Sequence, residues 1–533
     1  MGVIKNEYDV EGLSPTESYP GTAVKHISSK VPVYGDEKGA VPGESFTIGD
    51  SPYARIQRFA NRFGVEPRGI ERVPEDERTD RTLAKAGTMW LAANMVVSSF
   101  AIGVLAVPVF HLGFVDAFLT ILFINLLGIT PVCFFSTFGP VFGLRQMVLS
   151  RFYYGWYGVK VIAVFNILAC VGWSSVNVIV GAQLLHAVNN DIPGFAGIII
   201  IAAATFLVTL FGYKIVHYYE FYSWIPCFII FLIVLGEFAH SGAFVNIPMG
   251  VGSSEAGAVL SFASSVFGFA TGWTSYAADY TVYQPHTVSR VKTFAWTWGG
   301  LILPLLFTET LGLAVATAMT FDPETGAPTN SYAERYEISH IGGLLAEVLF
   351  PPFGRFGQFC LVVLALSIIA NNCPNIYSVS LSLQVLGRWT QAVPRFIWTF
   401  VGTLIYVAIA IPGYSHFESV LENFMLVIGY WLAIYEGIAL AEHFIFRRGI
   451  KGYNVADYTS AHLLPPGIAA ILAFCFGVLG AVMGMAQVWF VGPIGKHIGN
   501  PLYGGDVGFP LAFGFAFVSY VGLRTVEKRK FGR

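Results

Sequence analysis

Residues 90–110, WLAANMVVSSFAIGVLAVPVF, and residues 258–280, AVLSFASSVFGFATGWTSYAADY, are apolar stretches that carry small residues near their centres. Small residues at membrane depth allow a helix to be interrupted, and the freed backbone groups then line a cavity or bind a ligand. The two stretches therefore predict interrupted membrane helices, with close helix packing as the alternative role of the glycines. The small residues are Ser98, Ser99 and Gly103 in the first stretch and Gly268 and Gly272 in the second.

Apolar stretches of membrane-spanning length recur from Gly87 to the C-terminal region. A helix needs about 20 apolar residues to cross a hydrocarbon layer of about 30 Å. We count twelve such stretches, and the two interrupted ones are the first and the sixth. Interruptions five helices apart predict an inverted five-plus-five repeat, followed by two further helices, with a substrate site between the breaks. The predicted spans are 88–110, 114–138, 159–188, 194–213, 218–240, 257–279, 294–319, 356–386, 395–413, 419–445, 465–489 and 506–524.

The span pattern divides the chain into a polar N-terminal tail, a transporter core and a short C-terminal tail. The segment 332–353 is apolar but short and ends in two prolines, so we expect an interfacial helix there, outside the count. The predicted parts are 1–86 for the N-terminal tail, 87–524 for the core and 525–533 for the C-terminal tail, with repeats at about 88–240 and 257–445 and extra helices at about 465–524.

The composition agrees with a membrane protein and excludes several other classes. Of 533 residues, 55% are hydrophobic and 12% are charged, whereas a typical soluble protein has about 25% charged residues. The formal net charge of -2 leaves no basic field for nucleic acid. The six cysteines show no paired metal-ligand spacing, so we expect neither a metal nor another cofactor.

The distribution of basic residues predicts the orientation. Cytoplasmic loops of membrane proteins are enriched in Lys and Arg. With the twelve spans above, 28 of the 31 Lys and Arg residues fall in the two tails, in the even-numbered connections or at the span ends that border them. The sequence therefore predicts a multi-pass membrane protein with both termini in the cytoplasm, and we expect it in the plasma membrane.

Polar residues are concentrated in the eighth span, LALSIIANNCPNIYSVS, residues 364–380. Asn371, Asn372 and Asn375 lie within five residues of one another, and Pro374 is expected to kink the helix. Asn371 and Asn375 are four residues apart and share a helix face. Carboxamides inside a membrane are costly unless paired and mark functional sites. The alternative is that they only bridge neighbouring helices.

The third and sixth spans add aromatic residues. In GWSSVNVIVGAQ, residues 172–183, Trp173 and Asn177 share a helix face at mid-span, and Trp273 directly follows Gly272. Indoles, carboxamides and hydroxyls without an obligatory buried charge favour a flat, neutral ring as substrate. A nucleobase meets this description, because its face stacks on Trp and its edge matches the adjacent donor and acceptor of a carboxamide.

Together these stretches resemble the fungal purine-cytosine permeases, a branch of the nucleobase/cation symporter family. The similarity covers most of residues 70–450, and the combination of stretches is far more specific than any one of them. The matching stretches are WLAANMVVSSFAIG (90–103), FGLRQMVLSRFYYG (142–155), GWSSVNVIVGAQ (172–183), FGYKIVHYYEFYSW (211–224), FGFATGWTSYAADYTVYQP (267–285) and ANNCPNIYSVSLSLQ (370–384).

The resemblance implies a fold like that of the bacterial leucine and hydantoin transporters and proton-coupled uptake of cytosine, adenine, guanine and hypoxanthine by alternating access. Hydantoin transporters of this family bind sodium with hydroxyls of span eight, but LALSIIA supplies only Ser367, so a proton is favoured as the coupling ion. Glu309, the acidic residue deepest in a span, is the predicted proton carrier. The substrate site that the resemblance implies comprises Ser99, Trp173, Asn177, Trp273, Asn371, Asn372 and Asn375, shaped by Ser98, Gly103, Gly268, Gly272 and Pro374.

Other functions remain open on sequence grounds. A carrier of the same family for uracil, allantoin, nucleosides or thiamine is the alternative, and a facilitative channel is a further one. The spans contain no nucleophile–base pair, paired-carboxylate or metalloprotease motif, so the sequence predicts a transporter and not an enzyme. The expected partners are small nucleobases and the lipid bilayer, with the oligomeric state undetermined.

Overall fold

The computed structural model describes residues 69–210, 213–322, 324–500 and 503–533. The predicted tail up to residue 68, and residues 211 and 212 of the stretch 211–224, lie outside these described residues. Helices make up most of the described chain, and one short hairpin is formed by β1 (Ala486–Gln487) and β2 (Phe490–Val491).

The helices account for all twelve predicted spans. Within the described residues, nine helices are long and apolar enough to cross a membrane, one bent pair forms a broken span, and two apolar helices are shorter. The long helices are α4 (Phe114–Ser136), α7 (Arg151–Val188), α9 (Tyr213–Ser241), α10 (Ser253–Thr271), α11 (Arg290–Ala316), α13 (Arg355–Val385), α15 (Arg395–Gly413), α16 (Phe417–Ala441) and α18 (Gly508–Phe531); the bent pair is α2 (Leu83–Asn94) with α3 (Val97–Leu105); the shorter helices are α8 (Gly194–Leu210) and α17 (Ile468–Gly484).

Shorter elements connect the spans. The predicted interfacial helix is α12 (Ser331–Phe353), which is not among the membrane-length apolar helices. The remaining elements are η1 (Glu75–Glu77), α5 (Phe138–Phe142), α6 (Gln146–Leu149), η2 (Thr274–Tyr280), α14 (Arg388–Ala392), η3 (Tyr414–His416), η4 (Glu442–Phe446), η5 (Ile450–Gly452), η6 (Val455–Thr459) and η7 (Gly495–His497).

The first span is interrupted at Met95 and Val96. Val96 has an extended backbone (φ -134°, ψ 164°), and the helices on either side, α2 and α3, are bent by 54° relative to each other. The predicted interruption is therefore present, but it lies before Ser98, Ser99 and Gly103, which are all within the regular helix α3.

The sixth span is interrupted at Gly272 and Trp273. The α-helix α10 ends at Thr271, and the chain continues in the tighter helix η2 from Thr274 to Tyr280. Gly272 thus lies at the break, as expected. Gly268 lies one turn earlier, inside α10.

Gly103 and Gly268 serve close packing, the alternative that the sequence left open for the glycines. A Cβ on Gly103 would lie 1.8 Å from the backbone oxygen of Glu309, and a Cβ on Gly268 would lie 2.1 Å from that of Met425. Each glycine allows two helix backbones to approach closely, as small residues do in membrane proteins. Pro374 lies inside α13, which continues as a helix from Arg355 to Val385.

We expect Gly103→Ala to destabilise the protein strongly. Overpacking typically costs about 1–3 kcal/mol, and here the neighbour is backbone that cannot rotate away. The matched control is Gly236→Ala on α9, where a Cβ would meet no atom within 4 Å. Thermal unfolding of the detergent-purified variants measures the effect: Gly103→Ala should lower the Tm and the control should not. Equal Tm values for the two variants would contradict the packing role.

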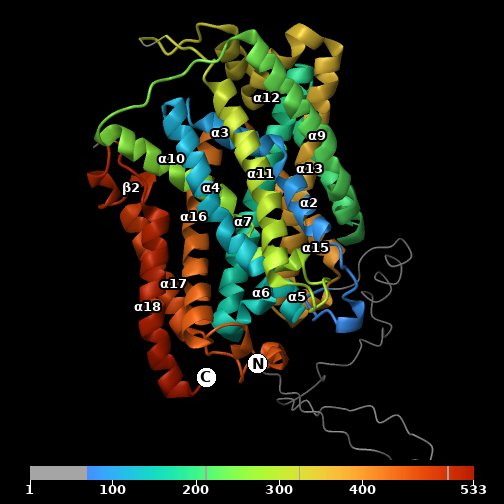
Figure 1. Cartoon of the computed structure of the whole chain (residues 1–533), viewed down its shortest axis with the longest axis vertical. Coiled ribbons are helices and arrows are strands. Elements are labelled where there is room, and N and C mark those ends of the chain that lie inside the picture. The colour runs from blue at the N-terminus through green and yellow to red at the C-terminus, as the bar shows by residue number, and fades with distance from the viewer. Residues whose placement is uncertain (1–68, 211–212, 323, 501–502) are drawn as a thin grey trace, which may run out of the picture. The chain divides into compact units, whose positions relative to one another are not determined.

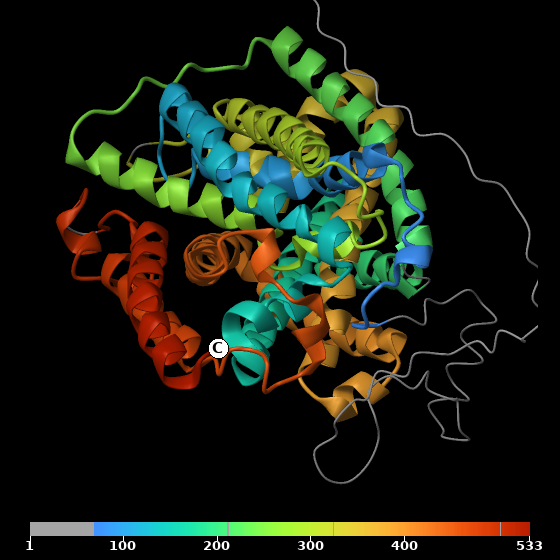
Figure 2. The same cartoon turned by 60° about the horizontal axis from the view of Figure 1, so that its bottom comes forward.

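The helices that carry the unusual residues lie at the centre of the bundle. The apolar windows of α7, α13 and α16 are largely buried, whereas those of α9, α15 and α18 are mostly exposed. Central α7 packs closely against α13, and α10 packs against α4 and α16. The last two helices, α17 and α18, pack against each other and lie at one edge, next to α16 (Figures 1 and 2). Both breaks therefore face a protein interior and not lipid.

Candidate functional site

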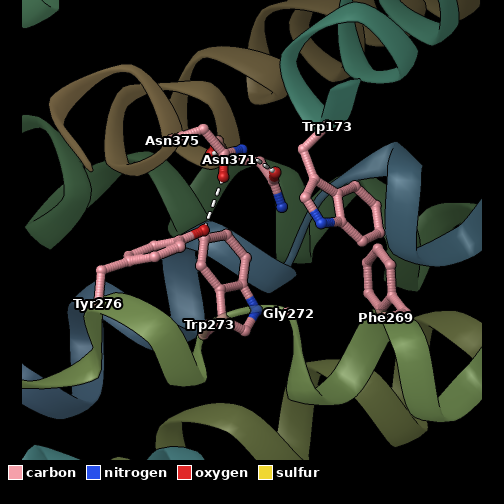
Figure 3. A pocket seen from close by; sticks show the side chains of 7 residues that line it. All are labelled: Trp173, Phe269, Gly272, Trp273, Tyr276, Asn371 and Asn375. Atoms are coloured by element: carbon pink, nitrogen blue, oxygen red, sulfur yellow. Dashed lines mark hydrogen bonds between the residues drawn. The ribbon is translucent and has the colours of Figure 1, made fainter. Parts of the chain in front are cut away.

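A small pocket lies where the break of the sixth span meets α7 and α13 (Figure 3). Its cavity volume is about 10 Å³, close to the space of one water molecule, so the site is closed around its own side chains. All its wall residues are uncharged, and they combine aromatic rings with two carboxamides, which is the composition expected for binding a neutral ring. The wall is made by Trp173 of α7, Phe269, Gly272, Trp273 and Tyr276 at the break, and Asn371 and Asn375 of α13.

Two pairs of aromatic rings form the apolar part of the wall. Trp173 meets Phe269 edge to face with ring centroids 5.2 Å apart, and Trp273 meets Tyr276 with centroids 5.9 Å apart. The first pair lies on the right of Figure 3 and the second on the left. Gly272 lies close to the first pair, since a Cβ there would be 3.3 Å from Trp173 Nε1. Two indoles therefore border the same pocket from different helices.

Asn371 and Asn375 provide the polar part of the wall, on one face of α13 as their spacing predicts. Tyr276 Oη donates a hydrogen bond to Asn375 Oδ1 at 2.7 Å (Figure 3). Asn375 Nδ2 donates to the backbone oxygen of Asn371 at 3.1 Å. A carboxamide has two donors and an acceptor with two lone pairs, so the edge of a ligand ring can exchange with these internal bonds.

Asn177 lies behind the wall and joins three helices. Its Nδ2 donates to Asn371 Oδ1 at 2.7 Å and to Asn372 Oδ1 at 2.9 Å. Its Oδ1 accepts a hydrogen bond from Ser98 Oγ at 2.6 Å. One buried carboxamide of α7 thereby holds two residues of α13 and one residue of α3, and it fixes the orientation of the Asn371 side chain that faces the pocket.

The break of the first span is bonded to the same site. Asn371 Nδ2 donates to the backbone oxygen of Ala93 at 2.6 Å, and Ser99 Oγ donates to that of Asn94 at 2.7 Å. These two carbonyl groups lie just before the interruption, where the helical hydrogen-bond pattern is lost. Trp273 Nε1 in turn donates to Asn94 Oδ1 at 3.2 Å. The two breaks are therefore linked through side chains of the candidate site.

Eleven of the twelve predicted site residues fall into three groups, and the twelfth, Pro374, lies inside α13. The pocket wall contains five of them, and a surrounding layer contains Ser98, Ser99, Asn177 and Asn372, which bond to the wall or to the first break. Gly103 and Gly268 lie at helix contacts away from the wall. The five wall residues are Trp173, Gly272, Trp273, Asn371 and Asn375.

Three residues of the site were missed in the sequence. Asn94 is the one amide in the first stretch, and Tyr276 follows Trp273 by three residues in the quoted sixth stretch. A polar residue inside an apolar span was the available signal for both. Phe269 gave no such signal, because one phenylalanine among many in apolar spans reads as core.

Glu309 lies outside the pocket wall. It is buried on α11, and its Oε2 accepts a hydrogen bond from Asn125 Nδ2 of α4 at 2.7 Å. Ser367, the hydroxyl considered for sodium, donates to the backbone oxygen of Leu364 in its own helix at 2.6 Å. Within the residues that the structure describes, no group of three His, Cys, Asp or Glu side chains is placed to hold a metal ion.

Comparison with known proteins identifies the family. Residues 72–492 match the family described as permeases for cytosine/purines, uracil, thiamine and allantoin. The purine-cytosine permease fcyB of Emericella nidulans is 63% identical over 495 residues, which cover 93% of this chain and 95% of the relative. The chain belongs to the fungal purine-cytosine permeases of the nucleobase/cation symporter family.

A second relative extends the match over nearly the full length of the permease. The purine-cytosine permease FCY2 of Saccharomyces cerevisiae is 42% identical over 532 residues, covering 96% of this chain and 98% of the relative. The protein is therefore a nucleobase transporter with multiple membrane spans and not an enzyme, and the resemblance found in the sequence is confirmed.

A solved structure confirms the predicted fold of the permease. Mhp1, a nucleobase-cation-symport-1 family transporter in a closed conformation with bromovinylhydantoin bound, has a TM-score of 0.66 at 13% identity, covering 88% of this chain and 97% of that chain. At this identity the likeness speaks for the fold alone. Together with the interrupted first and sixth spans, it confirms the leucine-transporter-like arrangement of two five-helix repeats plus two helices.

Proposed function

We propose that this permease takes up cytosine and the purines adenine, guanine and hypoxanthine, coupled to protons, by alternating access around the pocket between the two breaks. The observation that carries the proposal is the pocket wall itself, with two indoles and two carboxamides and only uncharged side chains. The names of the two fungal relatives agree with these substrates.

The chemistry of the wall favours a nucleobase over other small nutrients. Stacking of a base on an aromatic side chain contributes about 1–3 kcal/mol and accepts any base. Discrimination comes from hydrogen bonds to the base edge, because a wrong edge leaves buried amide groups unpaired. Trp173 and Trp273 supply the stacking faces, and Asn371 and Asn375 the edge contacts. An amino acid would need charged partners that this wall lacks.

Coupling to protons is the second part of the proposal. The hydroxyl that span eight offers for sodium, Ser367, is bonded within its own helix. Carboxyl groups are buried in several spans, among them the predicted carrier Glu309, so protonatable groups are available inside the bundle. We place both termini in the cytoplasm, following the distribution of Lys and Arg. We place the permease in the plasma membrane, where uptake of external nucleobases takes place.

Uptake of labelled cytosine, in cells lacking their own nucleobase carriers, tests both parts. We expect unlabelled adenine, guanine and hypoxanthine to compete and uracil, allantoin and cytidine to compete weakly, because only the former share the proposed edge contacts. Collapsing the proton gradient should abolish accumulation.

Each contrary outcome has its own meaning. Strong competition by allantoin or uracil would assign the permease to another substrate branch of the family. Dependence on sodium alone would refute proton coupling, and non-saturable uptake without accumulation would indicate a facilitative channel. Cells that carry the empty vector provide the background.

A further inference from the structure

Buried carboxyl groups occur in and beside the membrane-spanning helices: Asp116, Glu220, Asp279, Glu309, Glu436, Glu442, Asp506 and Glu527. Glu442 and Glu527 form ion pairs with Arg524, Arg145 donates to the backbone oxygen of Asp279, and Asp506 accepts a hydrogen bond from Tyr430. A carboxyl group inside a membrane is costly in its charged form and marks a functional position. The contacts of Glu309 and Glu436 decide which of these two can act on the substrate site.

Glu436 of α16 is hydrogen-bonded to the break in the sixth span. Thr271 Oγ1 donates a hydrogen bond to Glu436 Oε1. The hydroxyls of Thr271 and Thr274 are themselves hydrogen-bonded at 3.0 Å. Thr271 is the last residue of α10 and Thr274 is the first residue of η2. A chain of hydrogen bonds from the carboxyl group through Thr271 to Thr274 therefore connects the two halves of the interrupted span.

The residues between these two threonines belong to the pocket wall. They are Gly272 and Trp273, which line the pocket directly. A change in the hydrogen bonding of Glu436 is therefore transmitted to Trp273 across at most two residues of the break. Glu309, by comparison, bonds to Asn125 of α4 and lies against the backbone of Gly103, away from the wall.

We propose that Glu436 is the proton-binding site of the transport cycle, and that its protonation is coupled to substrate binding through Thr271 and Thr274. A charged carboxylate accepts hydrogen bonds only, so the Thr271 hydroxyl donates to it and the Thr274 hydroxyl donates to Thr271 Oγ1. When a proton binds Glu436 Oε1, this oxygen becomes a donor to Thr271 Oγ1, the threonine hydroxyls turn, and the break is held differently. Because such coupling is reciprocal, a base that favours one geometry of the break also favours one protonation state. This inference rests on the proposed proton coupling and names its site.

The other titratable groups packed around α16 are engaged in separate contacts. Within the described chain, no cation lies at ion-pair distance from Glu436. These neighbouring groups are Tyr430 and Tyr435 of α16, the first bonded to Asp506 and the second to Gln146 and Ser150; Asp506, which also accepts from Ser264 of α10; Tyr154 of α7, stacked on Tyr435; Asp279 of η2, accepting from the Gln146 backbone; Glu442 and His443 of η4, bonded to Arg524 and Tyr453; and Tyr520 of α18, bonded to Glu442.

Glu436→Gln tests the proposal, since glutamine keeps the size and hydrogen-bonding ability of the side chain but cannot release a proton. We expect this variant to exchange labelled for unlabelled cytosine across the membrane of preloaded cells, yet to lose accumulation and sensitivity to collapse of the proton gradient. A Glu436→Gln variant that still accumulates cytosine in a gradient-dependent way would overturn the proposal. The proposal would also be overturned if Glu309→Gln or Glu220→Gln, and not Glu436→Gln, lost proton-coupled accumulation while retaining exchange.

Thr274→Val provides a second test that keeps the carboxyl group. The variant removes, at nearly constant volume, the hydroxyl that donates to Thr271 Oγ1, and so weakens the hydrogen bond that Thr271 donates to the charged carboxylate. Protonation becomes easier, and half-maximal uptake should move to higher pH. An unchanged pH profile in a variant that reaches the membrane would contradict the coupling through Thr274. If wild-type uptake does not depend on the proton gradient, the proposed proton coupling fails first, and this outcome is distinct from failure of Glu436 alone.

Discussion

Asn177→Ala should abolish nucleobase uptake while the protein still reaches the plasma membrane. The substitution removes the hydrogen bonds to Ser98, Asn371 and Asn372 at once. Leaving a buried polar group unpaired costs about 1–3 kcal/mol, and about 3 kcal/mol corresponds to a factor of roughly 100 in an equilibrium constant. The orientation of Asn371 toward the pocket is lost with its partner. Initial rates of labelled cytosine uptake, normalised to surface protein, measure the effect.

Asn190→Ala is the matched control, because Asn190 is an exposed amide just beyond the end of α7. It should transport normally. A double variant with Ser98→Ala separates site positioning from general weakening: the two effects should be non-additive if both residues act in one network. Normal uptake by well-expressed Asn177→Ala would refute the assignment of this residue to the site.

Trp273→Ala should weaken substrate binding more than any other change of a single wall residue. The indole packs edge to face against Trp90, with ring centroids 5.5 Å apart, and also against Tyr276, and it bonds to Asn94. Loss of one stacking face corresponds to about 1–3 kcal/mol, or a rise of roughly 5- to 150-fold in KM. The KM for labelled cytosine and the inhibition constants of adenine and hypoxanthine should rise together, because stacking does not distinguish bases.

Two further variants sharpen this result. Trp273→Phe keeps an aromatic face but loses the bond to Asn94, so its KM should lie between those of wild type and Trp273→Ala. Trp489→Ala, in the turn of the β1–β2 hairpin, replaces an indole that is 67% exposed and should leave KM unchanged. A wild-type KM for Trp273→Ala would show that the base does not stack on this residue.

The spans could be predicted because their signal is local. Crossing a membrane requires apolar residues along a whole helix, so each span is visible in its own segment. An apolar helix lies at each of the twelve predicted spans, two of them short, but the ends differ: α7 begins at Arg151 where 159 was predicted, and α18 ends at Phe531 where 524 was predicted. Asn371 and Asn375 could also be predicted as site residues, because amides are rare in an apolar span and the spacing of these two places them on one helix face.

The exact position of the break in the first span could not be predicted from the sequence. Ser98, Ser99 and Gly103 are small enough either to interrupt a helix or to pack against one, and only the neighbouring helix decides between these roles. Gly103 faces the backbone of Glu309, which is more than two hundred residues away in sequence, so it packs. The break occurs instead at Val96, where the preceding carbonyl groups find partners in Asn371 and Ser99.

The role of the acidic residues could not be predicted from the sequence either. Depth in a span ranked Glu309 first, but depth does not reveal neighbours. In the structure Glu436 bonds to Thr271, which bonds to Thr274 across the break, whereas Glu309 bonds to Asn125. Nothing in the sequence around Gly272 and Trp273 indicates that the flanking threonines contact a glutamate of α16.

By itself, the sequence determined that this chain is a helical membrane bundle with two interrupted spans and that its candidate site is polar but uncharged. These properties depend on residue types and on their spacing along one helix. The tertiary structure alone decided which side chains form the pocket wall, which lie behind it and which carboxyl group bonds to the break. The physical reason is that each helix has several faces, and packing against helices distant in sequence selects the face that meets the site.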